Sequence, residues 1–373
     1  MEENNLKGIT LFVRKNAVMF IALAAAVITS FIVPPDSKYL DYFDYQTLSC
    51  LFCVLATVCA LKNINFFYIL AQKIVRRFKT ARLCVLALVY ITFIGSMLIA
   101  NDMALLTFLP LGYFVLSTTG KQKYMAFTFI MQNIAANLGG MLTPFGNPQN
   151  LYLYTKFNIS NSEFVSVMFA PFAVAVLLIT LACVIFIKPE QLYIEDEKIA
   201  FSAQRAVIYL LLFSFAIAMV FRGVPYQAGL VLIPSVLVFA DKKALKDVDY
   251  PLLLTFVFFF VFAGNMARIE AVKALFSGIM DKSTLLVSVL SCQIISNVPS
   301  AILLSQFTDN YRDLLVGVNI GGVGTLIASL ASLITFREYV KHNPNRSGYY
   351  IAMFSAINFS FLFLLTGFML LYK

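Results

Sequence analysis

A polar run rich in glycine, proline and carboxamide side chains interrupts long apolar sequence in the first half of this chain. It extends from Asn137 to Asn150 and ends in Gly146-Asn147-Pro148-Gln149-Asn150. Carboxamide and backbone oxygens can ligate a small cation, and backbone amides can hold an anion. Broken backbone at membrane depth survives only where protein buries it or where it lines a wet cavity. We therefore interpret the run either as a loop between spans or as part of a binding site.

A related run in the second half of the chain favours the binding-site interpretation. Aligned without gaps, residues 137–151 and 319–333 are identical at five positions, which are Asn, Gly, Gly, Thr and Leu. In the same alignment Asn147 and Asn150 lie opposite Ser329 and Ser332. Paired interruptions of apolar segments in the two halves of a chain are the best indication of a transporter site that a sequence offers.

Two shorter polar interruptions each separate a pair of apolar segments. The first is Ala100-Asn101-Asp102 and the second is Ser296-Asn297-Val298-Pro299. Asp102 is the one carboxylate that we place near mid-membrane, where an ionised Asp costs about 2.5–3.5 kcal/mol. We interpret it as a coupling group that ligates Na⁺ or carries H⁺, or alternatively as an N-cap for the helix that begins at Met103. Both asparagines either contact a ligand or cap helix ends.

Composition indicates a protein whose solvent is lipid. The chain has 373 residues, of which 60% are hydrophobic and 13% are charged, and its mean hydropathy is +0.84. A soluble domain carries roughly 25% charged residues. Repeated apolar segments long enough to span a bilayer therefore predict an all-α polytopic membrane protein. The six cysteines lie in apolar segments, where we expect them to be packing residues.

Several function classes are disfavoured by the same residues. The one histidine, His342, lies in a charged segment, so catalysis by histidine at membrane depth is not expected. No nucleotide-binding motif and no other catalytic cluster is visible, so we expect neither an enzyme nor a bound cofactor. Dense glycine at two broken segments favours an occluded site over the continuous pore of a channel. The net charge of +9 lies mostly on predicted inner loops, so we interpret it as a topology signal, with no nucleic-acid partner.

The order of segments predicts two inverted repeats, each with a re-entrant helical hairpin and a broken transmembrane helix. Two full spans in place of the first hairpin are the alternative, because they also return the chain to the same side, and the polar residues between the two arms favour the hairpin. We expect the first repeat at residues 1–200, with its hairpin at 84–117 and its broken helix at 124–154. An unpaired linking helix follows at 201–225. The second repeat occupies 226–373, with its hairpin at 285–307 and its broken helix at 314–334. The other predicted spans are Ala17–Val33, Gln46–Leu61, Val165–Ile187, Val207–Phe221, Ala228–Ala240, Pro251–Ala263 and Tyr350–Leu371.

Charge predicts the orientation of these segments in the membrane. With a cytoplasmic N-terminus, most of the 28 Lys and Arg residues fall on inner segments, as the positive-inside rule requires. The stretch Asn65–Thr80 alternates apolar and basic residues at helical spacing, which predicts a helix on the inner surface, and Arg337–Arg346 is predicted as a basic inner loop. No cleavable signal peptide is apparent, so the first apolar run is expected to be a retained span of a multi-pass cell-membrane protein.

With this layout and the element Gly146-Asn147-Pro148-Gln149-Asn150, the chain resembles the ion transporter superfamily in its citrate-transporter-like branch. That group contains divalent anion:sodium symporters, citrate carriers, arsenite efflux permeases and one class of sodium/proton antiporter. In the dicarboxylate members, Ser-Asn-Thr motifs at both hairpin tips hold substrate carboxylates and help to bind sodium. Here Asn101 and Asn297 match these motifs, whereas the first Ser and both Thr do not. The tip with Asp102 is more similar to the arsenite and sodium/proton branches.

The resemblance implies a secondary active transporter of a small anion, for which a di- or tricarboxylate such as citrate is the expected substrate, coupled to Na⁺ or H⁺ by alternating access. The alternative on the same fold is a sodium/proton antiporter or an arsenite efflux permease. Expected partners are the substrate, the lipid bilayer and a second copy in a homodimer.

The expected site residues form two sets. Candidate substrate contacts are Asn101, Asn147, Gln149, Asn150, Ser296, Asn297, Ser329 and Ser332. Candidate ion-coupling residues are Asn101, Asp102, Asn137, Gly139, Gly140, Thr143, Asn297, Gly321, Gly322 and Thr325, with Na⁺ expected at Asn101, Asp102 and Gly139. The glycines permit close approach of backbone to an ion, or alternatively close packing between helices.

Overall fold

The computed structural model describes residue 13, residues 16–192 and residues 202–372. Apart from one isolated bridge between Thr80 and Gln191, the regular structure of these residues is helical. Six helices are long and apolar enough to cross a membrane, or seven if one bent helix pair counts as a single span. The predicted all-α polytopic fold is therefore confirmed. The expected N-terminal inner segment and the boundary at residues 200/201 lie outside the described residues.

The first predicted hairpin consists of α5 (Ala81–Ile99) and α6 (Asn101–Thr118), which pack against each other. The break between them is Ala100 alone, whose φ of 64° ends the helical hydrogen-bond ladder. Asn101 and Asp102 were expected in the break but belong to the first turn of α6. At 19 residues α5 is long enough to cross a membrane, so a re-entrant hairpin stays a prediction.

The second hairpin repeats this arrangement with a shorter returning arm. It consists of α15 (Thr284–Ile295) and α16 (Asn297–Leu304), and its break is Ser296 with a φ of 75°. A bend of 117° separates α15 from the preceding α14 (Glu270–Met280), an amphipathic surface helix. The corresponding surface helix before the first hairpin is α4 (Phe66–Val75).

Both polar runs of the sequence break a helix in two. In the first half, α7 (Met125–Gly139) and the short turn η3 (Gly140–Leu142) precede α8 (Pro148–Lys156), with a proline at the first position of α8 as helix starts favour. In the second half, α17 (Tyr311–Ile320) precedes α18 (Leu330–His342).

The predicted basic loop Arg337–Arg346 was too long, because α18 continues to His342. The side chain of Glu338 contacts Lys341 and His342 along one helix face. Tyr339 is buried and stacks on Tyr350, with ring centroids 4.5 Å apart. This packing and pairing extend the helix by two turns beyond the apolar segment.

The remaining spans pack crosswise between the two halves of the chain. Helix α2 (Ala17–Ile32) lies along α13 (Tyr250–Ala267), and α11 (Tyr226–Ala240) lies along α3 (Tyr45–Asn63). Thus the first predicted span of each half packs on the second span of the other half. Asp44 and Asp249 cap α3 and α13 in the same way, each accepting a backbone N–H three residues later at 2.9 and 3.0 Å.

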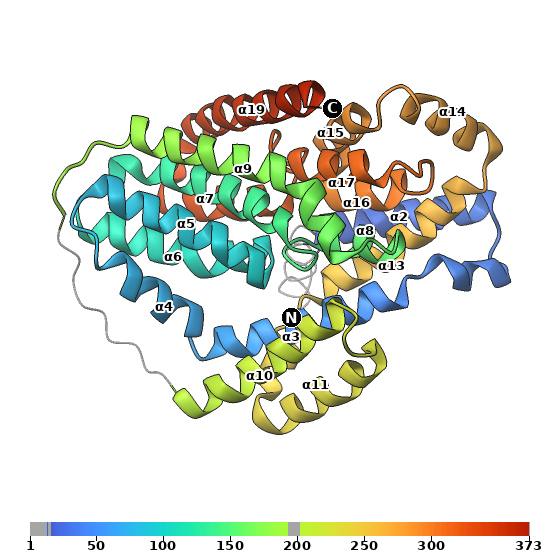
Figure 1. Ribbon diagram of the computed structural model, residues 1–373, viewed down its shortest axis with the longest axis horizontal. Coiled ribbons are helices and arrows are strands. Elements are labelled where there is room, and N and C mark those ends of the chain that lie inside the picture. Colours follow the sequence, from blue (N-terminus) through green and yellow to red (C-terminus); the bar gives the residue numbers. More distant parts are fainter. Residues whose placement is uncertain (1–12, 14–15, 193–201, 373) are drawn as a thin grey trace, which may run out of the picture.

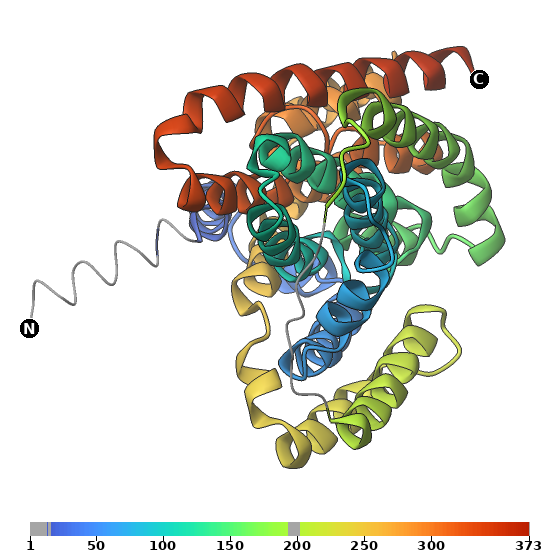
Figure 2. The ribbon, with the colours of Figure 1, turned by 90° about the vertical axis from the view of Figure 1, so that its left-hand side faces the viewer.

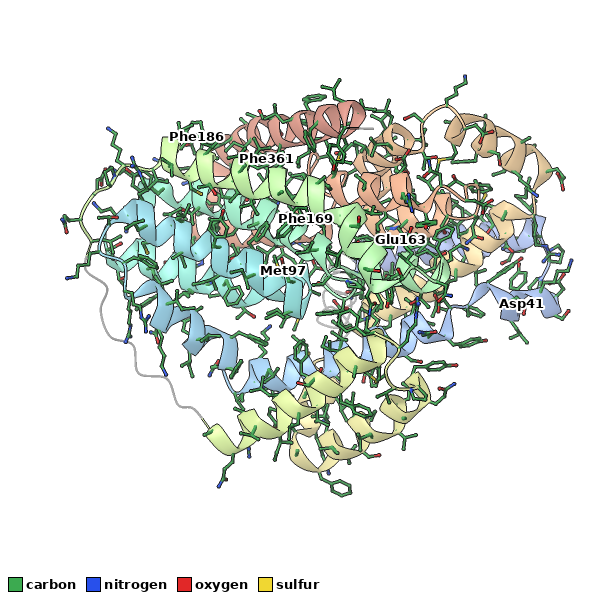
Figure 3. All side chains as sticks on the ribbon, viewed as in Figure 1. Asp41, Met97, Glu163, Phe169, Phe186 and Phe361 are labelled. Carbon is green, nitrogen blue, oxygen red and sulfur yellow. The ribbon has the colours of Figure 1, made fainter. Side chains whose placement is uncertain are left out.

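Figures 1 and 2 show α10 (Ala203–Val220) and α11 at the edge of the molecule opposite α19 (Ser347–Leu371). Between these edges lie the hairpins and the broken helices. Helix α9 (Asn161–Phe186) covers them together with α19, and its Phe169 and Phe186 are more than half exposed (Figure 3), as expected for side chains that face lipid. The shorter elements are η1 (Ser37–Tyr42), η2 (Gln122–Tyr124), α12 (Lys242–Lys246) and η4 (Pro344–Arg346).

Candidate functional site

Each returning hairpin arm meets the broken helix of the opposite half of the chain. Helix α6 packs against α18, and α16 packs against α8. At the second tip, Asn297 N–H donates to the carbonyl of Ala328, just before α18, at 2.9 Å. All four of these helices begin in this region, and helix N-termini present free N–H groups and a positive dipole end. The region therefore suits a bound anion without any Lys or Arg side chain.

A cluster of carboxamide side chains occupies this region, and Asn137 at the end of α7 is central to it. Asn101 Nδ2 donates to Asn137 Oδ1 at 3.2 Å, which connects the first hairpin tip to the first broken helix. Asn137 Nδ2 donates to the carbonyl of Asn133 at 3.1 Å, and its own carbonyl accepts from Asn147 Nδ2 at 3.1 Å. All of these side chains are buried, so their hydrogen bonds hold the break rigidly.

Asn319 joins the cluster from the second broken helix. Its Oδ1 accepts from Asn147 Nδ2 at 3.2 Å and from Gln149 Nε2 at 3.5 Å. Its Nδ2 donates to Asn150 Oδ1 at 2.6 Å. Asn150 Nδ2 in turn donates to the carbonyls of residues 140, 141 and 143, so Asn150 is fully used in holding the loop between α7 and α8.

Three buried oxygens in this region accept no hydrogen bond among the described residues. They are Asp102 Oδ1, Asn147 Oδ1 and Gln149 Oε1. A buried acceptor without a donor costs about 1–3 kcal/mol unless a ligand, a proton or a cation satisfies it. Amide and carboxylate oxygens are hard ligands that suit Na⁺, which is consistent with the predicted coupling ion. The described residues contain no group of three His, Cys, Asp or Glu side chains that could hold a metal ion.

Asp102 lies in the first turn of α6, where its charge is favoured by the helix dipole. It is not the N-cap, because the capping position is Ala100. Its backbone N–H donates to Asn101 Oδ1 at 2.9 Å, and its side chain is half-buried. The carboxylate is thus held at the first tip beside the carboxamide cluster, without a cationic partner among the described side chains.

The paired glycines of the two polar runs divide into two roles. A Cβ on Gly139 would lie 2.6 Å from Ser96 Oγ of α5, and one on Gly321 would lie 2.8 Å from Cys292 of α15. These first glycines permit close helix packing, which is the alternative role. The second glycines face the cluster: a Cβ on Gly322 would lie 3.1 Å from Asn297 Nδ2, and one on Gly140 would collide with Asn147 Oδ1.

The predicted hydroxyl residues are each bonded to protein groups. Thr143 Oγ1 donates to the carbonyl of Met97 at 2.7 Å, and Thr325 Oγ1 donates to that of Gln293 at 3.1 Å. Both acceptors lie three residues before a hairpin tip. The three serines also have partners: Ser296 donates to Ala328 O, Ser329 caps the N–H of Ala331, and Ser332 accepts from Asn133 Nδ2.

The structure adds three residues that the site prediction omitted, namely Asn133, Gln293 and Asn319. Gln293 Nε2 donates to the carbonyls of Gly321 and Val323 at 2.9 and 3.2 Å, which holds the second break against the second hairpin. Asn319 aligns with Asn137 in the two runs, and Asn133 precedes Asn137 by one helical turn. The sequence thus indicated Asn319 and Asn133 by their positions relative to Asn137, whereas no pattern in the sequence indicated Gln293.

Comparison with known proteins gives this arrangement a family. The family described as "Citrate transporter" matches residues 6–311. The chain belongs to the citrate transporter family. It is 32% identical over 321 residues to an uncharacterised transporter of Methanocaldococcus jannaschii, covering 86% of this chain and 88% of that protein. It is also 29% identical over 319 residues to the inner membrane protein YbiR of Escherichia coli, covering 83% of this chain and 84% of that protein.

Membership of the citrate transporter family confirms three of the expectations from the sequence. The protein is a multi-pass membrane transporter, its resemblance to the citrate-transporter-like branch is correct, and its partners include a bilayer and a small-molecule substrate. The residues of the carboxamide cluster and the tips stay predicted site residues. The family assignment indicates a transporter rather than an enzyme.

Proposed function

We propose that this citrate transporter family member is a secondary active transporter that carries a small anion, a di- or tricarboxylate such as citrate, together with Na⁺ or H⁺. One observation supports this above all others. A buried, uncharged carboxamide cluster lies where four helices begin, beside the half-buried carboxylate of Asp102, one oxygen of which has no hydrogen-bond partner among the described residues. Helix dipoles and amide donors favour the anion, and the carboxylate favours a cation.

The two ligands depend on each other in this proposal. An ionised Asp102 repels an anion bound nearby, and this repulsion is strong in a site with a low dielectric constant. A bound Na⁺ or a proton on the carboxylate removes the repulsion, so the anion binds well only when the coupling ion is present. Such mutual dependence is the thermodynamic basis of symport.

We propose that the two halves are inverted repeats, residues 1–200 and 226–373 with a linking helix at 201–225, and that the hairpins are re-entrant. The support is geometric. Both tips have positive φ, both hold a threonine hydroxyl on the carbonyl three residues before the tip, and the spans pack crosswise. Inverted repeats allow alternating access when one group of helices moves against the other.

The orientation with a cytoplasmic N-terminus is also a proposal, supported by the distribution of Lys and Arg. Chemical labelling of single-cysteine variants at Asn158 and at Lys79 tests it, because these exposed residues belong to opposite predicted faces. Labelling of the Asn158 position alone in intact cells is expected. The homodimer stays a prediction, which cross-linking in membranes would test.

The second candidate function is cation/proton antiport or arsenite efflux on the same fold. The unpartnered oxygen of Asp102 favours it, because the described site contains an anionic side chain and no cationic one. An antiporter binds either cation at this carboxylate in turn and needs no anion. Proton movement on addition of Na⁺, without any carboxylate uptake, would identify this function.

Uptake by purified protein in proteoliposomes tests the main proposal. Labelled citrate and succinate are offered with an inward Na⁺ gradient and then with an inward H⁺ gradient. We expect uptake that requires one of the gradients and that is lost in Asn297→Ala. Asn358→Ala is the matched control, since Asn358 is equally buried but lies on α19 and bonds only to its own helix. Absence of citrate and succinate uptake under both gradients would contradict the proposal.

A further inference from the structure

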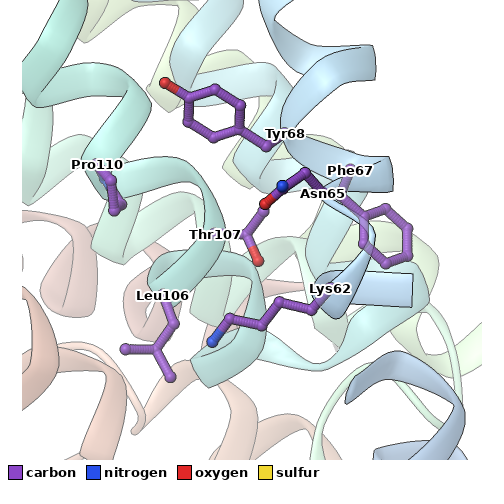
Figure 4. Close-up of a pocket in the computed structure, with 7 residues that line it drawn as sticks. All are labelled: Lys62, Asn65, Phe67, Tyr68, Leu106, Thr107 and Pro110. Carbon is purple, nitrogen blue, oxygen red and sulfur yellow. The ribbon is translucent and has the colours of Figure 1, made fainter. Parts of the chain in front are cut away.

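A cavity of about 190 Å³ lies between α3, α4 and the returning arm of the first hairpin, α6. Figure 4 shows its lining, with the side chain of Lys62 extending across it from the end of α3 toward Leu106 on α6. The other polar side chains at its edge come from Asn65, Tyr68 and Thr107. On the proposed orientation, this cavity lies toward the cytoplasmic face, where α3 ends.

The cavity and the first hairpin tip share one face of α6. Leu106 and Pro110, which line the cavity, follow Asp102 at intervals of four residues. Residues four apart on a helix lie on the same side, one turn after another. A solute in the cavity is therefore on the side of α6 that leads toward Asp102.

Lys62 has no ion-pair partner among the described residues. Three carboxylates lie on the neighbouring segment, and two of them have other roles: Asp241 accepts from Asn63 Nδ2 at 3.1 Å and caps α12, and Asp249 caps α13. None of the three, Asp247 included, lines the cavity. Lys62 is half-buried, and its positive charge in a cavity walled by Phe67, Leu106 and Pro110 attracts anions, because low-dielectric walls focus its field.

The second cavity, of about 290 Å³, differs in charge. It lies on the opposite predicted face, between η1, α13 and the end of α8, and its lysine is Lys156. Asp41 and Asp44 line the same cavity, and the charge of Asp44 acts directly on Lys156. This cavity has no excess of positive charge, so the two cavities differ electrostatically.

We infer that the cavity at Lys62 is an inner vestibule that binds the carboxylate anion before it enters, or after it leaves, the site at the hairpin tips. The inference rests on the proposed anion transport. Lys62 is assigned the role of a capture residue, which raises the local concentration of the anion at the inner face only. Lys62 is assigned no role in coupling, because we propose that the coupling ion binds at Asp102.

The test compares Lys62→Gln with Lys73→Gln, which removes the same charge from an exposed position on α4 outside the cavity. Citrate and succinate transport is measured in right-side-out and inside-out vesicles that contain the full chain. For Lys62→Gln we expect the KM at the inner face to rise about tenfold. The kcat/KM for uptake from the outer face is expected to fall by the same factor, because the gradients fix the ratio of kcat/KM in the two directions, and the requirement for the coupling gradient is expected to stay unchanged. Lys62→Arg and Lys73→Gln are both expected to retain the wild-type KM at the inner face.

A chemical rescue keeps the test decisive if Lys62→Gln folds poorly. The six native cysteines are all buried, so a thiol introduced by Lys62→Cys is the accessible one. We expect a methanethiosulfonate that carries an ammonium group to restore the low inner KM, and a neutral reagent of the same size to leave it high. Equal effects of both reagents, or an unchanged KM in Lys62→Gln at both faces, would overturn the inference. Absence of carboxylate transport by the wild type would instead reject the proposed function on which it rests.

Discussion

At the tip of the first hairpin Ala100 has φ 64° and ψ 153°, and at the tip of the second Ser296 has φ 75° and ψ 159°. Each is followed by an asparagine whose Oδ1 accepts the next backbone N–H at 2.9 Å. The next residue is Asp102 in the first half and Val298 in the second. The backbone is thus repeated, whereas the carboxylate is not. The two tips therefore share one backbone geometry, and only the first has the carboxylate that we propose as the coupling group.

The largest expected effect comes from exchanging the residues that differ. Asp102→Asn removes the charge and keeps the size, and we expect it to abolish gradient-driven uptake, a loss of more than about tenfold for a charged ligand contact of 1.5–3 kcal/mol. Val298→Asn at the corresponding position is the control and is expected to retain most of the uptake. Similar losses in the two variants, measured in proteoliposomes, would mean that the two tips share the coupling role.

A second effect concerns the shared backbone. Both tip residues have a φ and ψ that favour glycine, and such conformations cost of order 1–3 kcal/mol for other residues. We therefore expect Ala100→Gly to raise the Tm of the purified protein. Ser296→Gly is expected to raise it less, because it also loses the hydrogen bond from Ser296 Oγ to Ala328 O at 3.2 Å. A lower Tm in Ala100→Gly would contradict this account of the first tip.

A third effect compares the two threonines that hold the hairpins. Thr143→Val and Thr325→Val each remove one side-chain hydrogen bond to a hairpin carbonyl, and each is expected to destabilise the protein by about 1 kcal/mol. In Thr325→Val the N–H of residue 325 still donates to Gln293 Oε1 at 2.9 Å, so the second hairpin keeps an attachment that the first lacks. We expect the larger fall in Tm for Thr143→Val. A larger fall in Thr325→Val would show that the hydrogen bond to Gln293 Oε1 does not hold the second hairpin when the threonine hydroxyl is removed.

The smallest effect is at the segments that follow the hairpins. Tyr124 donates to Glu190 at 2.9 Å after the first hairpin, and Tyr311, after the second hairpin, donates to Glu163 of α9 at 2.6 Å. Lys121, Lys123 and Tyr124 lower the pKa of Glu190 to about 2. Because the folded pKa is below the usual value of 4.5, the stabilisation is complete above that value and is lost as the pH falls through about 2.

Glu190→Gln is accordingly expected to lower the Tm slightly at neutral pH, since exposed ion pairs contribute little. The difference from the wild type is expected to shrink between pH 4.5 and 2. Glu163→Gln is the matched variant for the segment that follows the second hairpin, with a similar small decrease at neutral pH. A difference in Tm for Glu190→Gln that does not change with acidification would show that the pairing with Lys121 and Lys123 does not stabilise the fold.

Local sequence determined the helices, the two hairpins and the two breaks. Apolar length specifies a span, and glycine, proline and asparagine specify where it is interrupted, because hydrocarbon leaves no alternative partner for broken backbone. The run from Asn137 to Asn150 and the aligned run at 319–333 therefore predicted where the two helices are broken, and the candidate site at these breaks stays a prediction. The end of α18 was misplaced because its last two turns are stabilised by packing on Tyr350, which apolar length does not reveal.

Only the tertiary structure decided which polar groups meet. Asn147 and Asn319 are bonded at 3.2 Å although they come from different halves of the chain, and no local pattern encodes such a pairing. In the same way, close packing against α5 and α15 requires a small residue at Gly139 and Gly321. The position of α6 beside the end of α3 forms the cavity that Lys62 lines. Residue type states what a side chain can bond, whereas the packing of distant helices decides which partner it has and which oxygens are left for a ligand.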